Sequence, residues 1–435
     1  MSWLSVERWS TAASMLAGLV YLAAVFSHRP ALQRRWIAGL VLLAVAARGV
    51  VAAAPPLLET DFYRYLWDGA VVSAGLNPYA HAPLDVLSQT SLGVDTQELN
   101  TLAQGAGGVL ASVNHPYLKT IYPPLAQVAF AAAAWIDPFG AQGWRVVLLI
   151  CDVITVVLLT RVLAHLKLPV DRIGIYGLNP LLLRESYGAL HMDLVVLPFV
   201  VGALLLALRG RGRLASLVAI AGSAVKVWPA LLVPLIAGPL WGRWKQLAAL
   251  LVGTALLGVL LWSPALIAWG DPRSGFIAYG QFWQNNDGFF RAGVWLCERV
   301  LEFYGAPPWY SHRIMRAIST AAVFAVAWWA TASGRRAEQR LPLSFLVVTA
   351  AAFLLSPTQL PWYWIWSLPL LVVVISRPLL LYTALLPLYY VQDDVPGVHW
   401  VEHAPVWVWL IASGIHAFRD RRGSFQNTVG VSRAS

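Results

Sequence analysis

Long apolar runs alternate with short polar segments along almost the whole chain. A run of about 20 apolar residues can cross a bilayer as a helix, and several of these runs approach that length. The pattern therefore predicts an all-α polytopic membrane protein with about 13 transmembrane helices, within a range of about 11 to 14. The predicted spans lie near residues 11–27, 36–54, 143–163, 173–187, 189–208, 213–226, 228–241, 246–263, 313–332, 341–356, 362–376, 378–391 and 404–418.

The segment "PLAQVAFAAAAWI", residues 124–136, complicates this count because it is apolar but short. A run of about 10–14 apolar residues is more typical of a re-entrant or interfacial helix than of a span. We therefore expect this segment to enter the membrane without crossing it. A full crossing would move every later polar loop to the opposite side of the membrane.

Composition agrees with a membrane protein. Of the 435 residues, 58% are hydrophobic and 12% are charged, whereas soluble proteins carry about 25% charged residues. The net charge of +10 does not indicate a nucleic-acid partner, because the cations cluster between apolar runs, as in cytoplasmic loops. The clusters are Arg29/Arg34/Arg35, Arg161/Lys167/Arg172, Arg209/Arg211/Arg213, Arg243/Lys245, Arg335/Arg336/Arg340, Arg377 and Arg419/Arg421/Arg422.

Placing these clusters in the cytoplasm puts the N-terminus outside, the C-terminus inside and most acidic residues outside. Two long segments, at about 55–122 and 264–312, then become outer loops. We predict a single transmembrane domain over residues 1–422 that includes both loops. The polar tail at 423–435 is predicted to be disordered.

The first outer loop begins with "ETDFYRYLWDG", which brings three acids and an arginine together just after a span. On a helix, Asp61, Arg64 and Asp68 share one face. In a purely structural interpretation, Thr60 or Asp61 caps the helix that follows and Arg64 pairs with Asp68. This explains the pair well but not the presence of both Glu59 and Asp61. Spacing alone leaves Asp61 as either a helix cap or a catalytic carboxylate.

Further polar and aromatic residues lie at the outer ends of other predicted spans. In a purely structural interpretation, Arg184 pairs with Glu185 and His191 pairs with Asp193 in "RESYGALHMD". A lysine can extend its amine to water, and an interfacial aromatic belt would explain "PWYWIW". Together, however, the segments gather carboxylates, cations and aromatic faces at one membrane surface. The residues concerned are Arg184, Glu185, His191, Asp193, Lys226, Trp362 and Tyr363.

The chemistry that fits these groups is sugar transfer from a lipid phosphate. The chain has no Gly-x-Ser-x-Gly, His-Glu-x-x-His or Cys-x-x-Cys pattern, so hydrolase and zinc-enzyme functions lack support. Sugar transfer needs one carboxylate to deprotonate the acceptor hydroxyl. It also needs cations or donors to hold the phosphate leaving group. Aromatic faces suit sugar rings, and apolar spans can form a groove for the lipid tail.

The motifs "TDFYRYLWDG…GLNPY", "TIYPPLAQ", "NPLLLRESYGALHMD", "KVWPALLVP" and "PWYWIWSLPLL" resemble integral-membrane glycosyltransferases of the GT-C fold in their order and spacing. The resemblance covers about residues 55–371. It is greatest to family 87-like bacterial mannosyltransferases and more distant to the catalytic subunit of the first GPI mannosyltransferase. It implies a GT-C-like helical bundle and a multi-pass enzyme of the inner membrane whose active site faces the periplasm.

The resemblance also implies the substrates and the place of the catalytic base. The donor would be a polyprenyl-phosphate sugar, with mannose as the implied sugar, and the acceptor a glycan or glycolipid. The reaction would invert the anomeric centre. The base of such enzymes lies in the first large outer loop close after a span, which is the place of Asp61. The GPI enzyme carries Asp-x-Asp there, whereas this chain has Glu59-Thr60-Asp61.

On this basis Asp61 is predicted to be the general base, and Glu59 is predicted to orient it or the acceptor. Lys226 is the favoured phosphate contact because no acid neighbours it in the sequence. No cofactor is predicted, and the residues leave a divalent metal open. The predicted contacts to donor or acceptor are Arg64, Asp68, Lys226, Arg184, His191, Asp193, Arg291, Tyr122, Trp362 and Tyr363.

Two other functions compete with this one. A transporter or flippase of lipid-linked sugars could use the same carboxylates and aromatics. It should also show internal repeats and charges deep in mid-span, and the sequence pattern does not indicate either. A purely structural membrane subunit would leave the ordered outer-end motifs unexplained. The sequence therefore favours the glycosyltransferase.

Overall fold

The computed structural model shows a helical protein. Within the described residues there is no strand, and the only sheet-like pairing is an isolated bridge between Asn285 and Thr358. This confirms the predicted all-α class. Arg29, Arg335 and Arg336, which the topology prediction placed in the cytoplasm, lie outside the described residues. The structure describes residues 3–27, 34–56, 59–88, 95–334 and 340–431.

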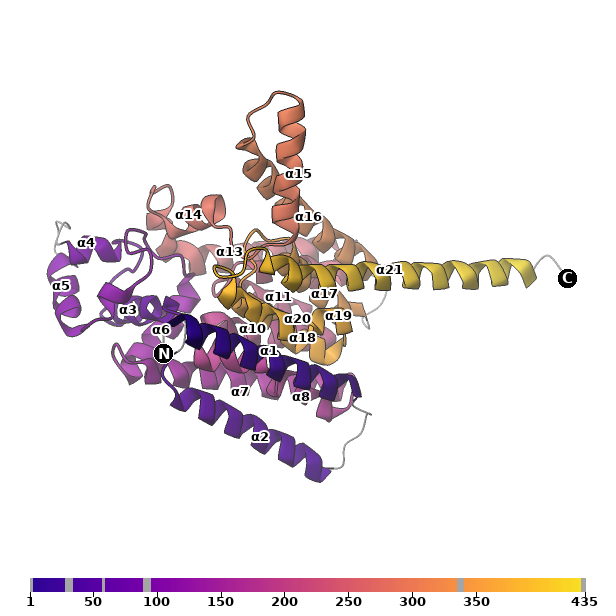
Figure 1. Cartoon of the computed structure of the whole chain (residues 1–435), viewed down its shortest axis with the longest axis horizontal. Coiled ribbons are helices and arrows are strands. Elements are labelled where there is room, and N and C mark those ends of the chain that lie inside the picture. The colour runs from indigo at the N-terminus through magenta and orange to yellow at the C-terminus, as the bar shows by residue number, and fades with distance from the viewer. Residues whose placement is uncertain (1–2, 28–33, 57–58, 89–94, 335–339, 432–435) are drawn as a thin grey trace. The chain divides into compact units, whose positions relative to one another are not determined.

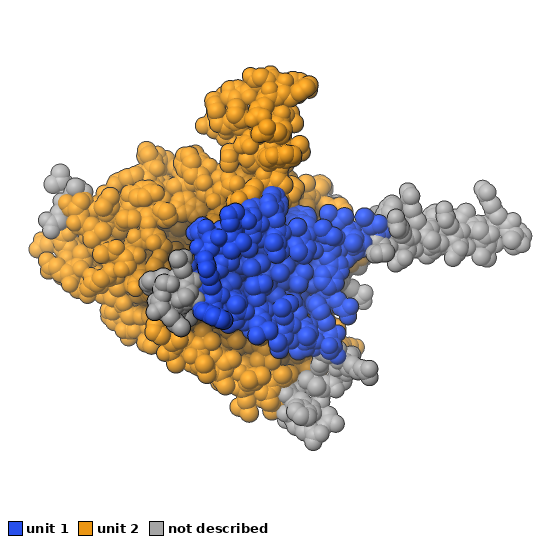
Figure 2. Space-filling view, in the orientation of Figure 1, with its two compact units in different colours: residues 1–27, 375–435 blue, residues 28–374 orange. Residues whose placement is uncertain are grey.

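The chain forms two compact units, coloured separately in Figure 2. The first unit contains residues 1–27 and 375–435, and the second contains residues 28–374. The predicted disordered tail begins at 423, whereas the last helix of the first unit extends to Val431. The prediction of one domain over 1–422 stays a prediction. The helices of the first unit are α1 (Trp3–Ser27), α19 (Arg377–Leu380), α20 (Tyr382–Leu385) and α21 (Val398–Val431).

The second unit contains the remaining helices (Figure 1) and, at Leu183–Gly188, one π-helical turn. Its helices are α2 (Arg34–Ala53), α3 (Asp61–Ser73), α4 (Pro83–Leu87), α5 (Asp95–Gly105), α6 (Pro124–Ile136), α7 (Ala141–His165), α8 (Ile173–Gly177), α9 (Pro180–Leu182), α10 (Leu197–Leu208), α11 (Gly212–Ser223), α12 (Val233–Ala237), α13 (Trp244–Trp262), α14 (Gly275–Phe282), α15 (Phe289–Phe303), α16 (Tyr310–Gly334), α17 (Leu341–Leu354) and α18 (Leu368–Val373).

Four helical segments of the described chain are long and apolar enough to cross a membrane. A fifth candidate is a broken segment, Pro180–Gly188 followed by Met192–Leu208, with a bend of 108°. These segments support a membrane protein, whereas the predicted count of about 13 spans is not confirmed. The four segments are Glu7–Ser27, Ala141–His165, Trp244–Ala268 and Tyr310–Ser333.

Prolines explain why several predicted spans appear as short pieces. The run at 228–241 is divided into Trp228–Leu232, Val233–Ala237 and Gly238–Leu240, each with a proline in its first turn. Proline lacks the N–H group that continues a helix and clashes with the preceding turn. The apolar pattern therefore locates these segments but overstates how continuous their helices are.

Helix α6 is the apolar segment predicted to enter the membrane without crossing it. Its 13 residues span about 20 Å at 1.5 Å per residue, less than the roughly 30 Å hydrocarbon core of a bilayer. It contacts both α3 and α7. Its length agrees with a partial crossing, which stays a prediction.

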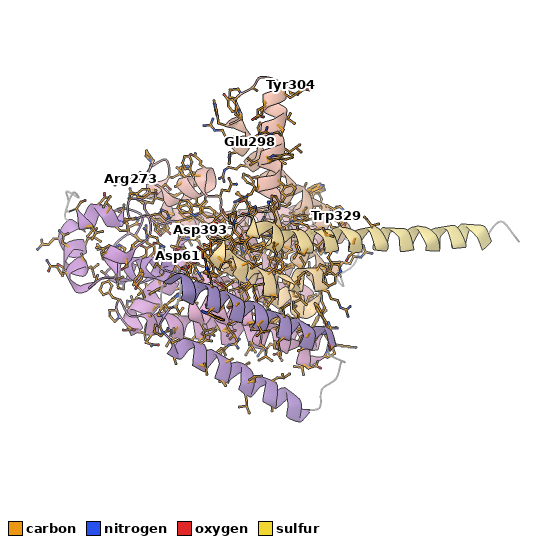
Figure 3. The ribbon with its side chains drawn as sticks, viewed as in Figure 1. Asp61, Arg273, Glu298, Tyr304, Trp329 and Asp393 are labelled. Atoms are coloured by element: carbon orange, nitrogen blue, oxygen red, sulfur yellow. The ribbon has the colours of Figure 1, made fainter. Side chains whose placement is uncertain are left out.

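Two glycines allow α3, α6 and α7 to pack closely. A Cβ atom on Gly69 of α3 would overlap the carbonyl group of Phe130 on α6. A Cβ atom on Gly143 of α7 would overlap the carbonyl oxygen of Ala133 on α6. The backbones can approach this closely only because glycine has no side chain. This packing fixes α3, whose first residue is Asp61, labelled in Figure 3.

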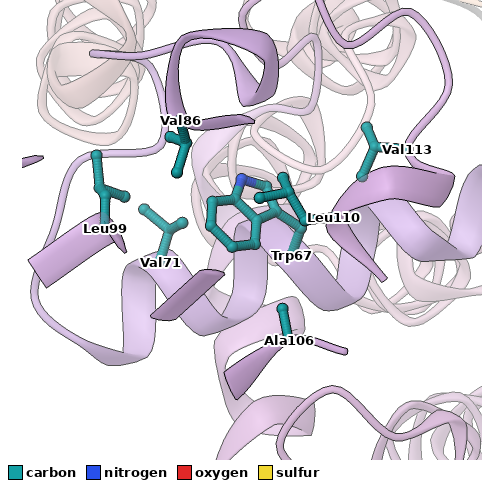
Figure 4. Close-up of a cluster of buried hydrophobic side chains, with 7 residues drawn as sticks. All are labelled: Trp67, Val71, Val86, Leu99, Ala106, Leu110 and Val113. Carbon is teal, nitrogen blue, oxygen red and sulfur yellow. The ribbon is translucent and has the colours of Figure 1, made fainter. Parts of the chain in front are cut away.

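Part of the predicted first outer loop, residues 55–122, folds as helices with a core of their own (Figure 4). Helices α3, α4 and α5 contribute to it, and Trp67 lies among smaller apolar side chains. This segment is therefore a small packed layer rather than an irregular loop, and its location outside the membrane stays a prediction. Its buried core residues are Trp67, Val71, Val86, Leu99, Ala106, Leu110 and Val113.

Candidate active site

Asp61 is the first residue of α3 and does not act as its cap. The N-cap position belongs to Thr60, whose side chain makes no capping hydrogen bond. The carboxylate of Asp61 instead accepts a hydrogen bond from Asn114 Nδ2 at 3.2 Å. The structural interpretation of Asp61 as a helix cap is therefore wrong. The side chain remains partly exposed, which leaves it accessible for chemistry.

The electrostatic surroundings of Asp61 combine burial with nearby cations. Burial raises the pKa of Asp61 above its ordinary value, while the Asn114 hydrogen bond and the charges of Lys226 and His115 act in the opposite direction. A raised pKa makes a carboxylate a stronger base once it is ionised. The cations keep the ionised form accessible.

Glu59 lies near Asp61, and its carboxyl group is also strongly affected by burial. Burial raises the pKa of Glu59 to about 9, the carboxylates of Asp61 and Glu185 add to the rise, and Arg184 opposes it. Glu59 is therefore protonated at pH 7 and can donate a hydrogen bond. Two neighbouring carboxyl groups do not readily ionise together, and a protonated Glu59 does not repel a negative charge on Asp61.

Lys226 has an acidic partner that the sequence did not reveal. Its Nζ lies 3.0 Å from Oδ1 of Asp193, and the same oxygen accepts a hydrogen bond from Trp366 Nε1 at 2.7 Å. Lys226 has no acidic neighbour in the sequence, but Asp193, 33 positions earlier, lies beside it in the fold. The Lys226 side chain is 16% exposed and that of Asp193 is 1% exposed, so of this pair only Lys226 can reach a ligand.

Aromatic rings surround the Lys226 ammonium. It lies 4.5 Å from the centre of the Tyr363 ring and 5.6 Å from that of Trp366, which is cation–π distance. Tyr363 and Trp366 stack on each other at 4.8 Å. The hydroxyl of Tyr279 donates a hydrogen bond to that of Tyr363 at 3.1 Å. The motif "PWYWIW" thus forms a wall behind the lysine rather than only a belt at the lipid surface.

The segment "RESYGALHMD" supplies the next group of site residues. Arg184 and Glu185 lie on the π-helical turn Leu183–Gly188, with Arg184 Nε 3.5 Å from a carboxylate oxygen of Glu185. His191 Nε2 lies 3.7 Å from the other Glu185 oxygen. The His191 ring stacks on Trp362 at 3.6 Å. Of the two pairs that a structural network would need here, Arg184–Glu185 is present, whereas His191 lies beside Glu185 and Asp193 lies beside Lys226. The charge of Glu185 also acts on Glu59.

Burial divides the predicted residues into two classes. Those that remain partly exposed can touch a ligand, and those that are buried can act only through neighbours in this conformation. The partly exposed residues are Glu59, Asp61, Tyr122, Arg184, Lys226, Arg291 and Tyr363. The buried residues are Arg64, Asp68, His191, Asp193 and Trp362.

Arg64 and Asp68 form the helix pair that their spacing predicts. Arg64 Nε lies 3.1 Å from Asp68 Oδ1, and Arg64 Nη2 donates to the carbonyl of Leu118 at 2.9 Å. Gln127 Nε2 donates to the other Asp68 oxygen at 3.0 Å. The pair therefore connects α3 to the segment at 118 and to α6.

Arg291 and Tyr122 lie in different surroundings. Arg291, on α15, pairs with Asp287 at 3.4 Å, and among the described residues no contact joins it to the Asp61 and Lys226 groups. Tyr122 follows the segment that carries Asn114, its ring packs edge-on against Tyr65, and the charge of Asp61 acts on its hydroxyl. The structure brings Tyr122 near Asp61 but does not bring Arg291 there.

Sequence reasoning missed Asn114, His115 and Trp366 as site residues. Asn114 and His115 belong to "NHPYLKT", and His115 adopts φ +48°, a left-handed conformation that is uncommon for residues other than glycine. Its ring lies 4.6 Å from that of Trp283. The polar Asn-His-Pro signal marks the segment, but no sequence pattern indicates that it returns to Asp61.

A resident metal was left open by the sequence. Over the described residues, no group of three or more His, Cys, Asp or Glu side chains is arranged to hold a metal ion. The chemistry of the cluster around Asp61 and Lys226 is that of hydrogen bonding, proton transfer and binding of an anion.

Comparison with known proteins identifies the family. Residues 8–243, more than half of the chain, match the family described as "Alpha-(1->6)-mannopyranosyltransferase, N-terminal domain". The chain belongs to this mannopyranosyltransferase family. The match contains Glu59, Asp61, Arg184, Asp193 and Lys226, whereas the aromatic wall lies beyond it. It confirms the resemblance to mannosyltransferases noted from the sequence motifs.

A relative supports the same family. The chain is similar to alpha-(1->6)-mannopyranosyltransferase B of Corynebacterium glutamicum, with 28% identity over 187 residues. The aligned region covers 41% of this chain and 26% of the relative. The match therefore covers about a quarter of the length of that relative.

Proposed function

We propose that this protein is a membrane glycosyltransferase that moves mannose from a polyprenyl-phosphate donor to a glycan or glycolipid acceptor. The observation that carries the proposal is the convergence of a partly exposed carboxylate, Asp61, with the ammonium of Lys226, whose charge acts on it. Family membership supports mannose as the sugar. The positive clusters of the other loops support an active site on the periplasmic side of the inner membrane.

Asp61 is the proposed general base. In the reaction, the acceptor hydroxyl oxygen forms a bond to the anomeric carbon of mannose while its proton moves to Asp61. The bond from that carbon to the phosphate oxygen breaks, and polyprenyl phosphate leaves with the electron pair. Attack opposite the leaving group inverts the anomeric centre. A phosphate leaves as a stable anion, so this scheme requires no general acid.

Glu59 has a different proposed role. Because it is protonated at neutral pH, it cannot take a proton from the acceptor. Its O–H group can donate a hydrogen bond that orients the acceptor hydroxyl or the Asp61 carboxylate. In this proposal the two carboxyl groups have separate roles, with Asp61 accepting the proton and Glu59 orienting the reacting groups.

The donor phosphate is proposed to bind at Lys226, with Arg184 as a second cation. The ammonium is already desolvated by aromatic rings and by Asp193, which strengthens its attraction for an anion. Tyr363 and Tyr122 offer partly exposed rings for the sugar. The buried residues Arg64 and Asp68, and likewise His191, Asp193 and Trp362, are proposed to support these groups from behind.

The transporter alternative needs reconsideration because mid-span charges do exist. Asp152 lies within the membrane-capable segment Ala141–His165 and pairs with Arg48 at 2.6 Å. The sequence-based statement that such charges are missing was wrong. Hydroxyl groups of Tyr176 and Tyr187 also donate to Asp152, so its charge is fully satisfied by the protein. We therefore retain the glycosyltransferase as the better-supported function.

Reconstituted transfer tests this proposal. Purified protein in liposomes receives polyprenyl-phosphate mannose labelled in the sugar, with a mannose-containing glycolipid as acceptor. The expected result is a labelled acceptor whose new linkage has the inverted anomeric configuration. GDP-mannose serves as the matched control donor and should give no product. Movement of labelled donor between leaflets without any labelled acceptor would instead establish the transporter.

A further inference from the structure

Asp152 on α7 is the centre of a buried network that the proposed reaction does not use. Its Oδ2 receives hydrogen bonds from Arg48 Nε and from the Tyr187 hydroxyl, both at 2.6 Å. Its Oδ1 receives one from the Tyr176 hydroxyl at 2.8 Å. Arg48 also donates to the carbonyl of Gly177 at 2.7 Å. A carboxylate within a membrane-capable helix is costly, so its position calls for a specific explanation.

One of these partners, Tyr187, lies on the π-helical turn that carries Arg184 and Glu185. A second contact from α7 reaches the other end of the same segment, where Trp144 Nε1 donates to the carbonyl of Leu190 at 2.8 Å. Trp144 and Asp152 are buried and lie two turns apart on α7. Helix α7 therefore holds the segment 183–191 at two points.

The segment that α7 holds is strained. It contains the break of the bent helix pair, residues 189–191, where the chain turns by 108°. Leu190 adopts φ +63°, which is unfavourable for a residue with a branched side chain. π-helical turns are themselves rare and occur often at functional sites. Such a conformation persists only when surrounding contacts fix it.

We propose that Asp152 and Trp144 are positioning residues that clamp this strained turn to α7 and so set Arg184 and Glu185 beside Glu59. The consequence for catalysis rests on the proposed function. The clamp itself is a statement about the segment 183–191 and stands apart from any reaction. Asp152 and Trp144 are both buried, so in this conformation they act on the site only through the residues that they contact.

Two tyrosines provide a matched pair of variants. Tyr187→Phe and Tyr176→Phe each remove one hydroxyl group that donates to Asp152, and both side chains are buried. Tyr187 lies on the π-helical turn, whereas Tyr176 lies on α8. If the network merely stabilises the fold, the two variants should behave alike. If the network positions the turn, Tyr187→Phe should loosen the turn more than Tyr176→Phe does.

Hydrogen exchange measured by mass spectrometry tests the clamp without any reaction. The amides of Ala189 and His191 donate to the carbonyls of Arg184 and Glu185 at 2.8 and 2.9 Å. We expect exchange of a peptide covering 183–191 to rise about 10-fold in Tyr187→Phe and to stay near wild type in Tyr176→Phe. Trp144→Phe, which removes the bond to Leu190, should also raise it. Equal exchange in the two tyrosine variants, raised or unraised, would overturn the clamp.

Transfer kinetics then test the consequence for catalysis. Tyr187→Phe should lower kcat about 10-fold and also raise the KM for the donor, because Arg184, the proposed second cation for the phosphate, lies in the clamped segment. Tyr176→Phe should lower kcat less than about twofold at a similar melting temperature. Equal kcat values in the two variants would refute the catalytic consequence. Inactive wild-type protein would count against the proposed function, while the exchange experiment would still decide the clamp.

Discussion

Replacing Lys226 with glutamine changes two interactions, which the structure allows to be separated. The substitution removes the ammonium proposed to bind the donor phosphate. It also leaves Asp193, 1% exposed and 3.0 Å from Lys226 Nζ, without its cationic partner. A single variant therefore confuses loss of binding with loss of stability. The double variant Lys226→Gln/Asp193→Asn removes both charges and keeps a carbonyl oxygen that can accept from Trp366.

The two effects have different sizes. Breaking a buried ion pair costs roughly 3–5 kcal/mol of folding free energy, and the lower end applies because Lys226 is 16% exposed. A hydrogen bond to a charged group contributes about 1.5–3 kcal/mol. At about 1.4 kcal/mol for each tenfold change, its loss should raise the donor KM about 10- to 150-fold.

The assay combines thermal unfolding with steady-state transfer at varied donor and acceptor concentrations. We expect Lys226→Gln to lose stability and donor affinity together. The double variant should regain most of the stability but keep the raised donor KM, with little change in the acceptor KM. Lys226→Arg, which keeps the charge, should stay within about 10-fold of wild type. A wild-type donor KM in the folded double variant would refute the phosphate role of Lys226.

Three further predictions concern the fold, its pH dependence and its topology. Gly69→Ala should lower the melting temperature, because the added Cβ atom would overlap the Phe130 backbone. Gly39→Ala should not lower it, because no atom lies within 4 Å of the added Cβ atom. Equal changes in melting temperature in the two variants would contradict this packing. A hydrogen bond from Lys119 Nζ at 2.6 Å lowers the pKa of Asp271. Its stabilising contribution is therefore present above about pH 4, the unfolded pKa of an aspartate, and is lost as the pH falls through the lower folded pKa. Melting curves should show wild type losing its advantage over Asp271→Asn in that range, and a constant difference would argue otherwise. In protein without its two native cysteines, an impermeant thiol reagent should label Gln97→Cys but not Arg211→Cys in cells with a permeabilised outer membrane; the reverse pattern would invert the topology.

The sequence predicted the all-α class of the fold correctly, but it did not predict where individual helices are interrupted. Apolar length identifies where helices enter the bilayer, but it does not show where a proline divides a run, as at 228–241. The sequence shows Asp152 inside the predicted span 143–163, but it does not show what compensates its charge. Its partner Arg48 lies 104 positions away, and such a pairing is visible only in the fold.

The sequence predicted those groupings of site residues whose members lie close together along the chain. Glu59 and Asp61 are neighbours, and Arg64 and Asp68 share a helix face, so their grouping was foreseen. Long-range pairing was not foreseen, because nothing in the local sequence indicates that Asn114 reaches Asp61 or that Asp193 reaches Lys226. The local pattern therefore suggested candidate residues, while the fold decided which of them remain partly exposed.

The most direct test of the central claim compares Asp61→Asn with Asp68→Asn in the transfer assay. Both substitutions replace a carboxylate on α3 with an amide, and the amide oxygen introduced at position 61 could still accept the hydrogen bond from Asn114. Asp68 is buried in its pair with Arg64, so its loss should act mainly on stability. We expect folded Asp61→Asn protein to lose about 10²- to 10⁴-fold in kcat and Asp68→Asn to lose less than about 10-fold. Turnover by Asp61→Asn close to that of wild type would contradict the assignment of Asp61 as the base.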